Sequence, residues 1–128
     1  MSAIHQEVVI PASPARVYEV LTTATQFTDA TGGREASIDA SAGGAFSLFG
    51  GFIGGRTIEL VPGARLVQAW RAQNWEPGVY SLVRFTLAPE GTGTRVVLDH
   101  SSFPPDHETH LAAGWASNYW EPLTKYLG

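Results

Sequence analysis

The chain has 128 residues, of which 44% are hydrophobic and 16% charged, and its formal net charge is −4. This length and balance predict one folded domain, 1–128, with a single core, and they exclude a disordered chain. One lysine and seven scattered arginines form no basic stripe, and cysteine is absent. We therefore expect no nucleic-acid partner, no disulfide and no thiolate metal site.

The first residues, 1–6, lack the basic start and apolar core of a secretory signal. Together with the absence of cysteine, this favours a cytoplasmic protein. The longest apolar pattern in the chain is polar on its reverse face, so we expect no membrane insertion.

Residues 4–10 alternate between apolar and polar side chains, which predicts a strand. A turn follows, in which Ser13 is a suitable helix cap and Pro14 a suitable first helical residue. Apolar residues at helical spacing then predict one short helix, and a second short helical piece is expected to end at Thr31-Gly32-Gly33.

From Arg34 onward the pattern changes to short alternating segments separated by glycine and proline. Strands are expected in the segments 35–38, 45–49, 58–60, 66–70, 79–87 and 96–100. The glycine-rich run 50–55 is interpreted as a hairpin reversal at a pocket rim. Consecutive strands joined by short loops predict an antiparallel meander, which with the first strand gives about seven strands.

The last predicted element is a helix over Asp106–Leu127. Its large apolar residues recur in steps of three or four and so share one face; they are Leu111, Trp115, Tyr119, Leu123 and Tyr126. This face needs a concave partner, and the sheet is the only candidate. Pro122 removes one helical hydrogen bond, so we predict a kink within one turn of it.

Several short segments carry a resemblance to a known family. They are Ile10-Pro11-Ala12-Ser13-Pro14-Ala15-Arg16-Val17, Gly43-Gly44-Ala45-Phe46, Ile58-Glu59-Leu60-Val61-Pro62-Gly63-Ala64-Arg65-Leu66, Trp70, Thr94-Arg95-Val96, His100-Ser101-Ser102-Phe103-Pro104 and Gly114-Trp115. In this order and spacing the chain resembles the START-like (SRPBCC, helix-grip) superfamily, and within it the homologues of the activator of heat-shock-protein-90 ATPase. The resemblance implies an α+β fold, in which a curved antiparallel sheet of about seven strands wraps around a long C-terminal helix, with two short helices after strand 1.

The resemblance also implies a cavity between the sheet and the long helix, able to hold a small hydrophobic or amphipathic ligand. The residues expected to line it are Phe46, Leu48, Ile58, Gln68, Trp70, Val83, Phe85, His100, Leu111, Trp115, Asn118 and Tyr119. Two interpretations stay open, because the same side chains also suit a close-packed core. Three polar groups on inward faces favour the pocket, since burying each without a partner costs about 1 to 3 kcal/mol.

Other functions remain as alternatives. A cyclase- or dehydratase-like enzyme would use His100 for proton transfer with Tyr80 or Tyr119, although an isolated histidine is more often a satisfied core residue. A stress-related, co-chaperone-like interaction domain and a homodimer are further hypotheses, and Trp75 is interpreted as a pocket cap or a partner contact. No cofactor is expected. His107 and His110 are three residues apart, and the zinc-protease motif needs four, so no metal is expected either.

Overall fold

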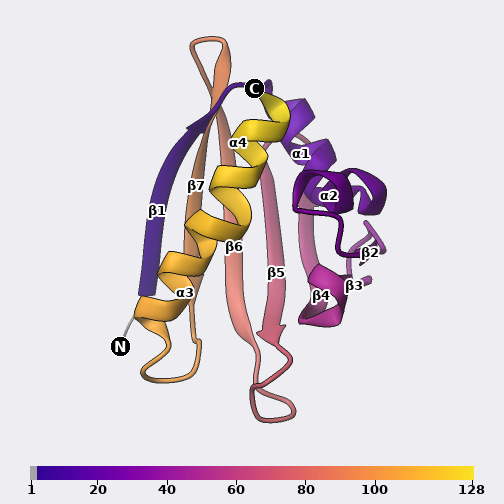
Figure 1. The fold of residues 1–128 in the computed structure, drawn as a ribbon, viewed down its shortest axis with the longest axis vertical. Helices are drawn as coiled ribbons and strands as arrows, with labels where there is room; N and C mark the ends of the chain where they lie inside the picture. Colours follow the sequence, from indigo (N-terminus) through magenta and orange to yellow (C-terminus); the bar gives the residue numbers. More distant parts are fainter. Residues whose placement is uncertain (1–2) are drawn as a thin grey trace.

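The computed structural model describes residues 3–128. A seven-stranded antiparallel sheet, in the order β1-β7-β6-β5-β4-β3-β2, holds a long C-terminal helix across one face (Figure 1). The strands are β1 (Ala3–Ile10), β2 (Ser37–Ile38), β3 (Ala45–Leu48), β4 (Ile53–Val61), β5 (Arg65–Ala72), β6 (Ser81–Glu90) and β7 (Gly93–Ser101). The helices are α1 (Pro14–Thr22), α2 (Ala24–Ala30), the 3₁₀ turn η1 (Phe49–Gly51), α3 (Glu108–Trp115), the π-helical turn η2 (Ala116–Trp120) and α4 (Glu121–Leu127). The predicted helix-grip architecture is thereby confirmed.

The first helix begins as its sequence predicts. The Ser13 hydroxyl accepts a hydrogen bond from the backbone N–H of Arg16 at 3.2 Å, and Pro14 occupies the first helical position. The Ser13 hydroxyl pairs a backbone N–H of the first helical turn that would otherwise lack a partner, and Pro14 has no backbone N–H to pair. α1 then packs against β6 and β7, and α2 lies beside β2 (Figure 1).

The C-terminal helix changes its hydrogen-bonding pattern halfway along. In η2 the backbone N–H of Glu121 donates to the carbonyl of Ala116, five residues earlier. This π turn lies within one turn of Pro122, where a kink is predicted, and α3 and α4 form one continuous coil (Figure 1); the kink itself stays a prediction. No helix within residues 3–128 is long and apolar enough to cross a membrane.

Two strand predictions were wrong in detail. The glycine-rich run is not wholly a reversal, because only Phe49–Gly51 forms a turn and Gly54 and Gly55 already belong to β4. Within β4 the pairing with β5 shifts between Thr57 and Glu59, as in a β-bulge. The extra residue, Ile58, therefore points outward and is 50% exposed, while Thr57 takes the inward position.

The core contains rings from both the sheet and the helix. Trp115 lies at its centre, stacked on Trp70 with centroids 5.5 Å apart and on Trp120 with centroids 5.9 Å apart. Phe85 meets Trp115 edge-on at 5.7 Å. Tyr119 lies 4.4 Å from Trp115, centroid to centroid. Over most of the interior, therefore, the rings of sheet and helix meet directly.

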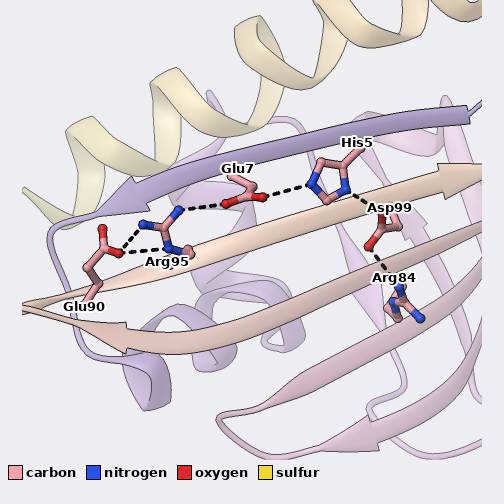
Figure 2. A network of polar contacts seen from close by, with 6 residues as sticks. All are labelled: His5, Glu7, Arg84, Glu90, Arg95 and Asp99. Carbon is pink, nitrogen blue, oxygen red and sulfur yellow. Dashed lines mark hydrogen bonds and ion pairs between the residues drawn. The ribbon is translucent and has the colours of Figure 1, made fainter.

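The outer face of the sheet carries a chain of charged side chains. Figure 2 shows it running from Glu90 through Arg95, Glu7, His5 and Asp99 to Arg84, on strands β1, β7 and β6. The His5 ring nitrogens lie 2.8 Å from an Asp99 oxygen and 3.0 Å from a Glu7 oxygen. The hydrogen bond to Asp99, and to a smaller extent the one to Glu7, raises the pKa of His5, because both favour the imidazolium.

Candidate functional site

A cavity of about 220 Å³ opens at one end of the interface between sheet and helix. Its walls come from η1 and the start of β4, the end of β5 with the loop that follows, and the first half of the C-terminal helix. The lining residues are Arg34, Phe49, Phe52, Ile53, Trp70, Ala72, Asn74, Trp75, His107, His110, Leu111, Gly114, Trp115, Asn118 and Tyr119. The lining is thus mostly aromatic and aliphatic, with a few polar groups, as is typical of small-molecule sites.

The loop after β5 brings Trp75 back over this end of the sheet. Trp75 is 6% exposed and meets Trp70 edge-on with centroids 5.8 Å apart. The Arg71 guanidinium fixes the loop from outside, since it donates to the carbonyls of Trp75 at 2.7 Å and Val79 at 3.2 Å. The loop therefore presents Trp75 as one wall of the cavity, in agreement with the first of its two predicted roles.

Two buried polar atoms of the lining lie near each other, and neither makes a hydrogen bond of good geometry within residues 3–128. They are the indole Nε1 of Trp70 and the hydroxyl of Tyr119, on side chains only 4% and 3% exposed. Burial raises the pKa of Tyr119, an effect only partly offset by the nearby Trp70 indole, so this phenol stays protonated. An unpaired buried polar group costs about 1–3 kcal/mol, and a bound acceptor atom would remove that cost.

Five of the twelve side chains predicted to line a pocket do lie in its wall: Trp70, Leu111, Trp115, Asn118 and Tyr119. Six others are buried in the packed core, outside the lining: Phe46, Leu48, Gln68, Val83, Phe85 and His100. The inward prediction for Ile58 was wrong because of the bulge in β4. The cavity is thus displaced toward one end of the sheet.

His100 occupies a closed hydrogen-bond chain inside the core. The Trp115 indole N–H donates to His100 Nδ1 at 3.0 Å, which leaves the ring proton on Nε2 to be donated to the Ser81 hydroxyl at 2.8 Å. Ser81 in turn donates to the carbonyl of Trp70 at 2.8 Å. Burial lowers the pKa of His100 to about 4, so the ring is neutral at physiological pH.

This arrangement is that of a structural histidine. Both ring nitrogens of His100 are engaged, its exposure is 0%, and it does not belong to the cavity lining. Tyr80, one suggested partner in proton transfer, is 48% exposed. The geometry gives the cyclase-like hypothesis no support.

Sequence reasoning missed most of the cavity rim. Arg34 and Asn74 lie in connections, where no periodic pattern assigns an inward direction, and Phe49, expected at the end of a strand, lies in η1 instead. The glycine-rich run did suggest a rim, and Phe52 and Ile53 within it do line the cavity.

The helix start beside the cavity carries His107 and His110, and His107 meets Trp75 edge-on at 6.2 Å. Within residues 3–128, no group of three or more histidine, cysteine, aspartate or glutamate side chains is arranged to hold a metal ion. The two histidines therefore contribute to the site as polar groups of its lining.

Comparisons with known proteins agree with this fold. The family model described as "Activator of Hsp90 ATPase homolog 1-like protein" matches residues 11–128. A curated relative, the activator of 90 kDa heat shock protein ATPase homolog of Dictyostelium discoideum, is 34% identical over 107 residues, which cover 83% of this chain and 28% of the relative. The chain spans between 28% and 34% of the length of the first curated relatives it matches.

Two solved structures have the same fold. An HSP90 activator from Plasmodium falciparum superimposes with a TM-score of 0.93 at 24% identity, covering 100% of this chain and 97% of the other. The Aha1 dimer from Colwellia psychrerythraea superimposes with a TM-score of 0.82 at 21% identity, covering 99% of this chain and 97% of the other. The fold described above is therefore shared by both proteins.

Proposed function

Because the chain belongs to the Activator of Hsp90 ATPase homolog 1-like family, in which the sheet grips a long helix, we propose that it binds a small, mainly apolar molecule in the cavity lined by Trp70, Trp75 and Trp115. One observation carries the proposal. The Trp70 indole N–H and the Tyr119 hydroxyl are buried near each other in the lining, and neither makes a hydrogen bond of good geometry within residues 3–128. Buried groups of this kind are normally paired, and outside the lining only the Gln68 side-chain oxygen is likewise unpaired within residues 3–128.

The volume limits the size of the ligand. A cavity of about 150 Å³ is enough to hold benzene, and drug-sized ligands occupy roughly 300–1,000 Å³. At about 220 Å³ the cavity suits a molecule of one or two rings. A sterol or a long acyl chain would need the walls to move apart.

Gly114 allows a direct test. It lines the cavity from the last turn of α3, and a Cβ added there would meet only the Asn118 side chain, at 3.6 Å. In Gly114→Leu we expect the added side chain to fill the cavity while the helix is retained, since leucine is a better helix former than glycine. Ala113→Leu is the matched control, because Ala113 is exposed on the same helix and is not part of the lining.

The assay is tryptophan fluorescence quenching with a panel of one- and two-ring aromatic compounds, supported by isothermal titration calorimetry. Three of the four tryptophans line the cavity, so occupancy should change the emission. Binding that is lost in Gly114→Leu and retained in Ala113→Leu would support the proposal. Equal binding by both variants, or none by the parent chain, would count against it.

A second candidate function is association with a chaperone of the Hsp90 class. Membership of the family and 34% identity to the Dictyostelium activator support it. Since the chain spans about a third of such relatives, stimulation of the chaperone ATPase is a separate question from binding. Calorimetry with purified Hsp90 tests association directly. We expect binding that Gly114→Leu leaves unchanged, and the absence of measurable binding would refute this candidate.

We further propose that the chain forms a homodimer, which the Colwellia psychrerythraea dimer of the same fold supports. Sedimentation equilibrium over a range of concentrations provides the test. A mass of one chain at every concentration would exclude it.

A further inference from the structure

Arg34 differs from the other arginines in its contacts. Within residues 3–128, the guanidinium groups of the other six each donate at least one hydrogen bond to a carboxylate or a carbonyl: Arg16, Arg56, Arg65, Arg71, Arg84 and Arg95. Arg34 has no such partner in that part of the chain. Its one recorded contact is with the ring of Phe49, whose centroid lies 5.0 Å from the guanidinium carbon. The group is therefore held at the cavity but free to pair with an anion.

The charge of the lining is opposite in sign to that of the whole chain. Arg34 is one of fifteen lining residues, which include no aspartate and no glutamate, whereas the chain as a whole has a net charge of −4. Asp106 and Glu108 flank His107 in the sequence, but neither belongs to the lining. The polar side chains of the same lining include two histidines and two asparagines, His107, His110, Asn74 and Asn118. An anionic group would thus meet a cation and amide or imidazole donors without an opposing carboxylate.

The polar rim is continuous with the aromatic interior. Phe49, which lies under Arg34, also meets Tyr119 edge-on with centroids 5.6 Å apart. Tyr119 and Trp70 also line the cavity, and their buried donors make no hydrogen bond of good geometry within residues 3–128. A ligand that reaches from Arg34 to these groups would have an anionic end, an apolar ring system and an acceptor atom, such as an ether or phenolic oxygen, at its far end.

We propose that the cavity selects small aromatic carboxylates of one or two rings, with the carboxylate paired to Arg34 and the rings packed against the cavity tryptophans. This inference rests on the proposed function, because it specifies the ligand class of the same cavity. A planar guanidinium is the group best suited to it, since it pairs with a carboxylate through two parallel hydrogen bonds.

The test compares two probes of nearly equal shape, 2-naphthoate and its neutral amide, 2-naphthamide, by isothermal titration calorimetry. Because Arg34 is exposed, we expect a moderate preference for the anion, roughly fivefold to tenfold. Arg34→Gln should abolish the preference by weakening naphthoate binding while leaving naphthamide unchanged. Arg56→Gln is the matched control, since Arg56 is also exposed but lies outside the lining, and it should retain the preference.

A second measurement does not depend on any variant. Added salt should weaken binding of naphthoate and leave that of naphthamide nearly constant, because salt screens an exposed ion pair. If both probes bind equally and Gly114→Leu abolishes both, the cavity is a ligand site and the anion preference is refuted. If neither probe binds, or if binding persists in Gly114→Leu, this inference falls together with the proposed function.

Discussion

Acidification should destabilise the fold through His100. Burial lowers the pKa of this ring from 6.5 to about 4. Between these values the unfolded chain binds a proton that the native chain excludes, so the free energy of unfolding decreases as pH falls. The slope approaches 1.4 kcal/mol per pH unit, and the whole window corresponds to roughly 3 kcal/mol. The contribution of the neutral His100 ring to stability is complete above its unfolded pKa of 6.5. It is lost below its folded pKa of about 4.

The assay is urea unfolding followed by circular dichroism, at pH values that span this window, for the parent chain and for His100→Gln. The glutamine keeps a donor and an acceptor but does not titrate. The carboxylates titrate at the acid end of the range in both chains. Their effect therefore cancels when the free energy of unfolding of one chain is subtracted from that of the other. We expect this difference to change by about 3 kcal/mol as pH falls through the window. Parallel stability profiles would refute the assignment of His100 as a buried neutral ring.

His5 provides a control of opposite sign. Its pKa is raised by Asp99 and Glu7, so its contribution to stability is fully present below its unfolded value of 6.5 and is lost as pH rises through the folded one. His5→Gln should therefore reduce stability at acidic pH and have no effect at alkaline pH. The same dependence in both histidine variants would mean that the two environments have been assigned wrongly.

Two further substitutions test the packing around the site, with thermal unfolding as the readout. Ser81→Ala leaves the His100 N–H without its acceptor and should lower the free energy of unfolding by about 1–3 kcal/mol. Ser101→Ala is the control, because the Ser101 hydroxyl makes no side-chain hydrogen bond within residues 3–128, and its free energy of unfolding should change by no more than about 0.5 kcal/mol. Gly55→Ala places a Cβ 1.8 Å from a carbonyl oxygen of β5, and we expect a loss of about 3 kcal/mol. In Gly54→Ala the nearest atom is 3.5 Å away, so a much smaller loss is expected; equal effects would refute the steric account.

Most of the fold could be predicted because the residue periodicities are kept over most of the chain. β5 and β6 bury alternate residues, and the step of four along the C-terminal helix correctly turns Leu111, Trp115 and Tyr119 inward. The predictions fail at Tyr126, which was expected on the same face but is 39% exposed, and where one residue is inserted. The bulge in β4 turns Ile58 outward. The π turn places Trp120 on the buried side although it does not follow the four-residue spacing of that face.

The location of the cavity could not be predicted in the same way. Periodicity assigns a direction to each side chain, but a void depends on how far the opposing side chains reach. Phe85 and Trp70 both point inward, yet Phe85 meets Trp115 and Trp120 in the core while Trp70 lies at the edge of the void. The rim residue Arg34 comes from a connection outside any periodic element, so only the assembled chain reveals its place.

The π turn and Gly114 together explain why the opening lies at one end. The extra residue in Ala116–Trp120 lets two neighbouring rings face the sheet: Trp120 donates to Gln6 of β1 at 2.7 Å, while Tyr119 packs on Phe49 at the opposite edge. At this level the helix therefore contacts both β1 and η1.

One turn earlier the helix carries Gly114, which costs about 1 kcal/mol relative to alanine in a helix interior. The backbone there does not require glycine, since its φ is not positive and an added Cβ would meet nothing closer than 3.6 Å. Gly114 thus weakens the helix although the backbone conformation does not require glycine. The space left by its missing side chain explains its presence. Trp75 closes that space from the opposite side, so the cavity follows from a missing side chain on the helix and a tryptophan wall on the loop.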